Sequence, residues 1–158
     1  MTPAPAETHT LQSLADLDVW ARRTSSRFQA GHVVGLSGPM GAGKTTLVQA
    51  LTRALNVDTL RETVASPTFV LMHDYLSGRL PILHADLYRL GEDRSGEAAR
   101  ELLDAIASRQ SLVLIEWVEL ADFLTPCLTH HITLQARPDD SRLLTLRTMR
   151  QEPDPGSP

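Results

Sequence analysis

The residues with the clearest chemical potential are the eight consecutive positions 38–45, which read GPMGAGKT. They match the pattern G-x-x-x-x-G-K-[ST] at every required position. In such a loop the glycines allow backbone N–H groups to turn toward phosphate oxygens. Lys44 is then expected to reach the β- and γ-phosphates, and the Thr45 hydroxyl to ligate Mg²⁺. The predicted nucleotide contacts in this region are Gly38, Gly41, Ala42, Gly43, Lys44, Thr45 and Thr46.

The segments on either side of this loop have the character that the motif requires. An apolar run at 32–37 predicts a buried strand before it, and apolar residues at helical spacing predict a helix over about 45–55. The N-terminus of that helix would direct its dipole at the same anion. Lys44 is also the single lysine in a chain with fourteen arginines. A compact ammonium in place of a planar guanidinium is what a phosphate loop needs at this position.

Two carboxylates follow apolar runs and are candidates for the Mg²⁺ side of the site. Glu116 ends the run at 112–115, and Asp86 ends a predicted strand at 80–85. A carboxylate at the end of a neighbouring strand is the usual second protein ligand of Mg²⁺ in this class of site. The predicted catalytic residues are Lys44, Asp86 and Glu116, and the predicted metal ligands are Thr45, Glu116 and Asp86. Which carboxylate touches the metal directly stays open.

The identity of the base is indicated by an absence. Guanine-specific GTPases of the Ras type carry an N-K-x-D motif, and the only lysine here lies in the phosphate loop. ATP is therefore the expected nucleotide, bound with Mg²⁺.

The order of predicted elements indicates an α/β fold with a P-loop, a mixed and mostly parallel central sheet flanked by helices, and added β-hairpins. We expect one domain over 10–148, with flexible tails at 1–9 and 151–158. The remaining predicted elements are helices at 13–28 and 95–108, strands at 68–75, 80–86, 131–137 and 143–148, a tight turn at Ser77-Gly78, and a polar connection at 87–94. The later helix is expected to bury Ala99, Leu102, Leu103 and Ile106.

Composition limits the classes of partner. The chain has 158 residues and a formal net charge of −4, so it lacks the basic footprint of a protein that binds nucleic acid by itself. No apolar run approaches the length of a membrane span, and the N-terminus does not read as a secretory signal. We expect a cytoplasmic protein that binds neither membrane nor DNA.

Four motifs taken together resemble a known family. They are GAGKTT at 41–46, SPTF at 66–69, HADLYRL at 84–90 and IEW at 115–117. Their order and spacing resemble those of the bacterial TsaE (YjeE) proteins, the ATPase subunits of tRNA threonylcarbamoyladenosine (t6A) biosynthesis. The resemblance extends over about residues 10–148, and the three motifs after the phosphate loop make it specific.

The resemblance implies roles for further residues. Residues 66–69 would form a switch-like loop that senses the γ-phosphate, with Thr68 as a nucleotide contact. Asp86 would join the Mg²⁺ and water network, Glu116 would be the Walker-B acid, and Trp117 would line the site beside it. Arg142, in the last hairpin, would be a nucleotide contact.

The resemblance also implies partners. The family acts on a complex of TsaB and TsaD, in which TsaD modifies adenosine 37 of the tRNA, so this chain would meet tRNA only indirectly. Two other interpretations of the phosphate loop stay open: a small-molecule kinase, and a nucleotide-gated binding module with negligible hydrolysis.

Overall fold

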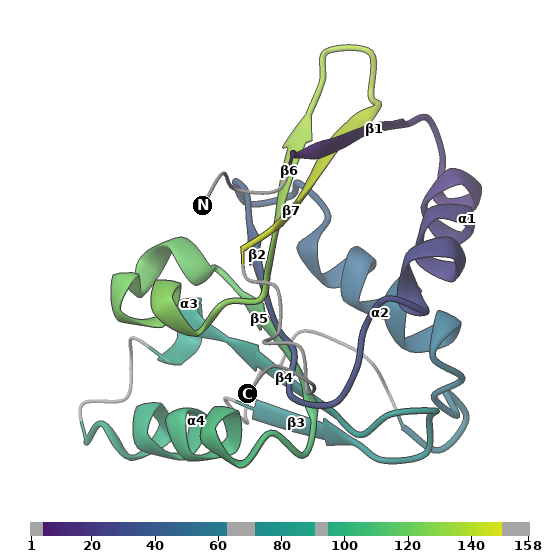
Figure 1. Ribbon diagram of the computed structural model, residues 1–158. Helices are drawn as coiled ribbons and strands as arrows, with labels where there is room; N and C mark the ends of the chain where they lie inside the picture. The colour runs from purple at the N-terminus through teal and green to yellow at the C-terminus, as the bar shows by residue number, and fades with distance from the viewer. Residues whose placement is uncertain (1–4, 63–71, 91–94, 150–158) are drawn as a thin grey trace, which may run out of the picture.

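The computed structural model describes residues 5–62, 72–90 and 95–149, and its central feature is a seven-stranded sheet (Figure 1). The spatial order of the strands is β1 (Glu7–Leu11), β7 (Arg142–Thr148), β6 (His130–Ala136), β2 (Val33–Ser37), β5 (Leu112–Glu116), β4 (Ile82–Asp86) and β3 (Met72–Tyr75). The middle strands β6, β2, β5 and β4 are parallel to one another. Strands β3, β7 and β1 are antiparallel to their neighbours. The expected mixed α/β sheet, parallel in its middle, is therefore confirmed.

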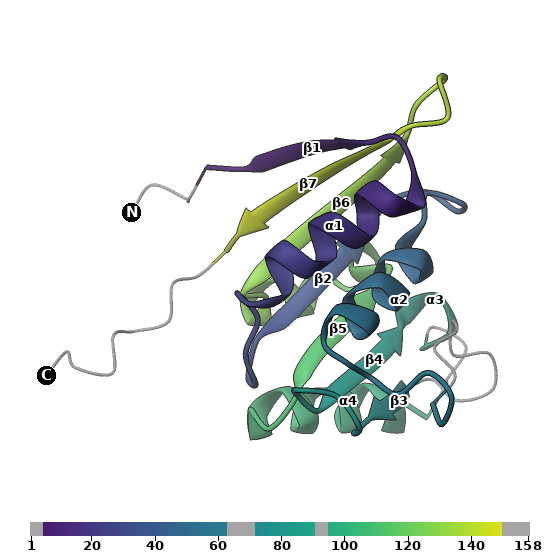
Figure 2. The same ribbon diagram turned by 90° about the vertical axis from the view of Figure 1, so that its right-hand side faces the viewer.

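Helices cover both faces of this sheet. Helices α1 (Leu14–Ser25) and α2 (Lys44–Ala54) lie on one face, and α4 (Glu97–Ser108) lies on the other (Figure 1, Figure 2). The short helix α3 (Leu87–Leu90) and the 3₁₀ helices η1 (Val118–Leu120) and η2 (Asp122–Cys127) pack on the α4 side. Every residue of β2, β4 and β5 is buried, as expected for parallel strands covered on both faces.

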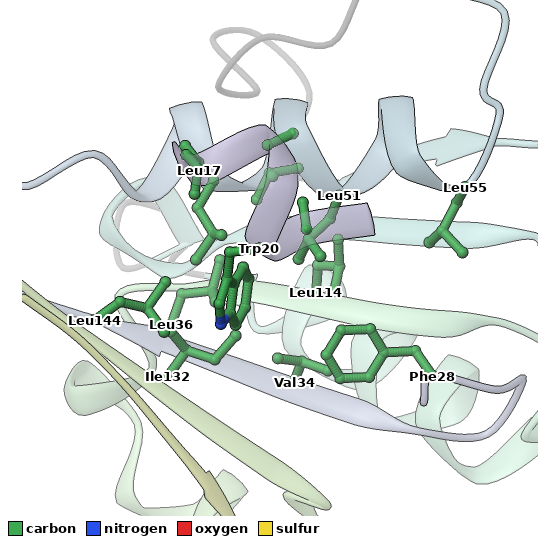
Figure 3. Packing of buried hydrophobic residues seen from close by; sticks show 14 of the residues in the cluster. Leu17, Trp20, Phe28, Val34, Leu36, Leu51, Leu55, Leu114, Ile132 and Leu144 are labelled. Atoms are coloured by element: carbon green, nitrogen blue, oxygen red, sulfur yellow. The ribbon is translucent and has the colours of Figure 1, made fainter. Parts of the chain in front are cut away.

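Side chains alternate between two hydrophobic cores because the strand period is two residues. Val34, Leu36 and Leu114 face α1 and α2, whereas Val33 and Val113 face α4 and the 3₁₀ helices. Figure 3 shows the first core, in which Leu17 and Trp20 of α1 and Leu51 of α2 lie over the sheet. This alternation decides which face each functional side chain can reach.

The expectation of a loose tail at 1–9 is wrong for residues 7–9, since they belong to β1. This strand pairs with β7 from Glu7 opposite Leu146 to Leu11 opposite Arg142. Most of its side chains are exposed, so no apolar pattern indicated it. Backbone hydrogen bonds to β7, which would otherwise be an open edge, form the strand.

The described connections on either side of β4 also differ from expectation. The chain between β3 and β4 spans 76–81, longer than a tight turn at Ser77-Gly78, because it is anchored to the end of α2. The Arg79 N–H donates to the Leu55 carbonyl at 2.7 Å, and a Cβ at Gly78 would lie 2.7 Å from the same oxygen. After β4, residues 87–90 form α3 instead of an irregular polar connection.

The expected inward face of α4 is partly wrong. Ala98 and Leu102 are its buried residues, with Ala105 and Ile106 packed partly against the same core, whereas Leu103 is 38% exposed. The stripe 98, 102, 105, 106 has the i, i+4 spacing of one helix face, and Leu103 lies outside it. Within the described ranges, no helix combines the length and apolar character needed to span a membrane.

The buried His130 makes stability depend on pH. Burial, with smaller contributions from the nearby His32 and Arg27, lowers the pKa of His130 to about 4. The unfolded chain binds this proton below about pH 6.5, so folding stability should fall as pH drops from 6.5 to 4 and level off below that. We predict that the drop in the free energy of unfolding between pH 6.5 and pH 4 is smaller in His130→Leu than in the wild type, by up to about 3 kcal/mol.

The measurement is urea unfolding at pH 7 and pH 4.5 for the wild type and the variant. His73→Gln, on exposed β3, is the matched control because its side chain lies at the surface. Equal pH dependence in the wild type and His130→Leu would contradict the assignment.

Candidate functional site

The loop between β2 and α2 has a backbone that only glycine adopts readily at three positions. The φ angles of Gly38, Gly41 and Gly43 are 149°, 78° and 108°. A Cβ at Gly38 would collide with the Leu134 carbonyl oxygen, whereas at Gly41 and Gly43 a Cβ would meet no atom within 4 Å. The first glycine therefore serves close packing on β6, and the other two leave open space beside the loop.

Two cavities adjoin the loop and share Gly41, Gly43 and Thr46. One cavity, of about 300 Å³, is mainly apolar. Its lining residues beyond the shared ones include Leu11, Ser13, Leu14, Leu17, Ala42, Leu47, Leu134, Asp140 and Arg142. The other, of about 380 Å³, contains the charged groups. It is lined in addition by Met40, Lys44, Thr45, Asp86, Tyr88, Arg89, Glu116 and Trp117. We name them the apolar cavity and the acidic cavity.

Lys44, the first residue of α2, reaches back over the loop. Its Nζ donates to the Gly38 carbonyl and, at 3.1 Å, to the Pro39 carbonyl. The same ammonium lies 3.7 Å from the centroid of the Trp117 ring, a cation–π distance. The side chain is only 5% exposed, so the charge is held within the loop.

Burial and neighbouring charges act in opposite directions on Lys44. Burial lowers its pKa from the usual range, and the carboxylates of Glu119, Glu116 and Asp86 oppose that change by raising it. Negative charge therefore surrounds the ammonium, although the lysine itself is suited to an anion.

The Thr45 hydroxyl and the Glu116 carboxylate are in direct contact. The hydroxyl oxygen lies 3.0 Å from each carboxylate oxygen. Glu116 is 2% exposed because it ends β5 in the same phase as Leu112 and Leu114, which face α2. His84 of β4 contacts the same carboxylate, with Nε2 at 2.8 Å from Oε1.

Asp86 lies beside Glu116 at the carboxyl ends of adjacent parallel strands. The two residues are register partners in the β4–β5 ladder, and Asp86 is 4% exposed. Its Oδ1 accepts the Tyr88 N–H at 3.0 Å, which ties the carboxylate to the first turn of α3. The structure thus brings Lys44, Thr45 and both candidate carboxylates to one cavity.

Trp117 and Tyr88 form an aromatic wall of the acidic cavity. Their ring centroids are 5.2 Å apart, and Trp117 has a left-handed backbone with φ of 60°. Such a conformation is unfavourable for a tryptophan and is maintained by its surroundings. It directs the ring beside Lys44 at the point where β5 passes into η1.

Arg142 lies on the other side of the loop from the carboxylates. It begins β7, lines the apolar cavity with Asp140, and donates from Nη1 to the Asp140 carbonyl at 2.8 Å. The Arg142 side chain therefore lies apart from the charged groups of the acidic cavity and lines the apolar cavity. Its predicted contact with the nucleotide would be made there. Thr68, with the whole 66–69 segment, falls outside the described residues, and its role stays a prediction.

Three contributions to the site were not predicted from sequence. The sequence analysis assigned no role to Glu119, and its Oε1 accepts the Gly38 N–H at 3.2 Å. His84 was assigned no role beyond its place in the motif at 84–90, and it contacts Glu116. The turn from β1 into α1, which includes Leu11 and Leu14, forms a wall of the apolar cavity. A signal for His84 was its place in a buried strand between Ile82 and Asp86.

The chemistry of the donors suits a divalent cation bound together with phosphate. Among the described residues, no group of three or more His, Cys, Asp or Glu side chains is placed to hold a metal ion. The Thr45 hydroxyl and the Glu116 carboxylate are hard oxygen donors in direct contact, and Mg²⁺ commonly binds through one or two such protein groups plus substrate phosphates and water. The residues present fit a Mg²⁺–nucleotide site.

Comparison with known proteins shows the family to which the sequence is similar. The family model described as "Threonylcarbamoyl adenosine biosynthesis protein TsaE" matches residues 11–144. Relatives named tRNA threonylcarbamoyladenosine biosynthesis protein TsaE include one from Bacillus subtilis, 34% identical over 125 residues that cover 79% of this chain and 75% of the relative. One from Rickettsia conorii is 32% identical over 145 residues, covering 91% and 79%.

A Nostoc relative of the same name is 43% identical over 91 residues, which cover 57% of this chain and 54% of the relative. The match thus spans about half the length of that protein. Among solved structures, Bacillus subtilis YdiB is similar, with a TM-score of 0.68 and 25% identity, covering 92% of this chain and 87% of the other.

Gly38 and Gly41 differ in what an added side chain would contact, so substitutions at the two positions should differ in their effect on stability. Gly38→Ala should lower the free energy of unfolding by about 2 kcal/mol or more, because the left-handed backbone and the collision with Leu134 add together. Gly41→Ala, which meets open space, should lower it by about 1 kcal/mol through its backbone alone. Urea unfolding of both variants measures the difference, and equal losses would refute the packing role of Gly38.

Proposed function

The chain belongs to the TsaE family, and from that membership and the site geometry we propose that it is the Mg²⁺-dependent, ATP-binding and ATP-hydrolysing subunit of the machinery for tRNA t6A37 modification. The observation that carries the catalytic part is the contact between Thr45 and Glu116, with Lys44 in the same cavity. This is the arrangement in which a P-loop hydroxyl and a Walker-B carboxylate hold Mg²⁺ against the β- and γ-phosphates.

The two cavities suggest how ATP would lie. The phosphates would occupy the loop, where Gly41 and Gly43 leave open space and the N-terminus of α2 favours an anion. The base would enter the apolar cavity between Leu11, Leu14 and Arg142. A mainly apolar pocket with a few polar groups is typical of a site for a flat organic ring.

Each polar residue of the acidic cavity would then have a separate task. Thr45 and Glu116 would hold Mg²⁺, whose chemistry when bound is to neutralise charge on the phosphate oxygens. Lys44 would exchange its carbonyl partners in the loop for the β- and γ-phosphates. Asp86 lies beside Glu116 in the β4–β5 ladder, and the Tyr88 N–H holds its Oδ1, so we assign this carboxylate to orient the attacking water.

The reaction would be displacement at the γ-phosphorus. An oxygen of water forms the new bond to phosphorus, the bond to the β–γ bridging oxygen breaks, and ADP leaves with that oxygen. The proton released from water would be accepted first by the Asp86 carboxylate or by phosphate. Lys44 and the loop amides would stabilise the charge that develops on the leaving oxygen.

The partners follow from the family. The family description supports a place in threonylcarbamoyladenosine biosynthesis, and we propose that the chain acts on a complex of TsaB and TsaD homologues. The net charge of −4 agrees with leaving tRNA contact to those partners.

We predict that Lys44→Ala and Glu116→Gln each lower kcat for ATP by about 100-fold or more, because the first removes the positive charge that would act on the phosphates and the second removes the negative charge that would hold Mg²⁺. Phosphate release by the purified protein is the measurement. Glu101→Gln, an exposed glutamate on α4, is the matched control and should keep wild-type turnover. Undiminished turnover in Lys44→Ala would refute the assignment of this loop.

A second prediction concerns the partners. Adding cognate TsaB and TsaD should raise ATP turnover by about tenfold or more, because docking would complete a cavity that is open at Met40 and Tyr88. ATP turnover that does not change when both partners are added would indicate an ATPase that acts outside this complex. A phosphate acceptor, as in a kinase, would then be the next candidate to test. Docking that requires ATP but proceeds without turnover would favour the nucleotide-gated binding module.

A further inference from the structure

His84 occupies a position where the strand pattern calls for an apolar side chain. It lies in β4 between Ile82 and Asp86, on the face toward α2, and its ladder partner in β5 is Leu114. It is 0% exposed. A buried imidazole is unfavourable unless its polar atoms are used, so its presence here calls for a specific contact.

That contact is with Glu116. Nε2 of His84 lies 2.8 Å from Oε1 of Glu116, and with an ionised carboxylate the imidazole nitrogen is the donor. The other ring nitrogen, Nδ1, has no hydrogen-bond partner among the described residues. The neighbouring Tyr75, with its ring centroid 6.2 Å away, has a hydroxyl that also finds no hydrogen-bond partner within the described ranges. In the part of the chain that the structure describes, the imidazole therefore uses Nε2 alone, and Nε2 is directed at the site.

The two donors, Thr45 and His84, contact the oxygens of the Glu116 carboxylate differently. Thr45 has a single hydroxyl proton and lies 3.0 Å from both oxygens, so by itself it leaves the carboxylate free to rotate. The bond from His84 selects Oε1. Oε2 is then the oxygen left to Thr45 and to a cation in the cavity.

We propose that His84 is a positioning residue that fixes the rotation of the Glu116 carboxylate, and so sets the affinity of the site for Mg²⁺ and the rate of hydrolysis. This inference rests on the proposed function, since it needs Glu116 to serve Mg²⁺. Groups that orient a metal-binding residue commonly change metal affinity or activity by about 10- to 100-fold when removed.

Three substitutions separate the hydrogen bond from simple packing. His84→Gln places an amide N–H near the position of Nε2 and should preserve the bond. His84→Asn places its amide near Nδ1, which has no partner, and His84→Leu has no donor. Tyr75→Phe removes the neighbouring unpartnered hydroxyl and controls for any small change in this core.

The readouts are kcat, KM, the Mg²⁺ concentration for half-maximal turnover, and ADP binding by calorimetry with Mg²⁺ and with EDTA. In His84→Leu and His84→Asn we expect kcat to fall and the required Mg²⁺ concentration to rise, each by about tenfold or more. ADP affinity in EDTA should stay unchanged, because the loop and Lys44 provide it. His84→Gln and Tyr75→Phe should stay within about threefold of wild type in every readout.

Three results would overturn the proposal. The first is a His84→Leu variant with wild-type kcat and Mg²⁺ dependence. The second is equal rescue by Asn and Gln, which would indicate packing alone. The third is loss of ADP binding in EDTA in His84→Leu, which would show a general structural role. If the wild type itself shows neither hydrolysis nor tighter ADP binding with Mg²⁺, the proposed function fails, and the role of His84 fails with it.

Discussion

A charged carboxylate held out of water at the end of β5 is the constraint around which the rest of the site is built. Glu116 is 2% exposed, and burying such a charge is strongly unfavourable unless donors replace the lost water. Those donors come from two other elements, Thr45 at the start of α2 and His84 in β4. The same carboxylate therefore joins the start of α2 to β4 and β5.

The parallel middle of the sheet makes this convergence feasible. Strands β2, β5 and β4 run in the same direction, so the phosphate loop, Glu116 and Asp86 all follow carboxyl ends and meet at one edge. The period of two residues then decides the face: Glu116 shares its phase with Leu114, and Asp86 with His84 and Ile82. The apolar residues that form the first core thus also direct the acidic groups toward α2.

This geometry explains why the placement of some features could be predicted from the sequence. The phosphate loop, Glu116 and the parallel middle of the sheet are encoded locally, by glycine spacing and by apolar runs that end in an acid. Strand β1 could not be predicted in this way, because pairing with β7 stabilises it and its own side chains are mostly exposed. The same holds for Glu119, whose contact with Gly38 joins segments 81 residues apart, and for Leu103, whose exposure depends on how α4 packs.

The balance of charge around Lys44 links nucleotide binding to the cation. Three carboxylates raise the pKa of this one ammonium against the effect of burial, so negative charge dominates its surroundings. A triphosphate brought into the acidic cavity would meet Asp86 and Glu116 at short range, where repulsion is poorly screened. Lys44 and Arg89 line the same cavity, but two positive side chains do not balance two carboxylates and a triphosphate. A divalent cation that entered with the nucleotide would offset this repulsion, so under the proposed function we expect the site to take up the nucleotide together with Mg²⁺ in preference to the free anion.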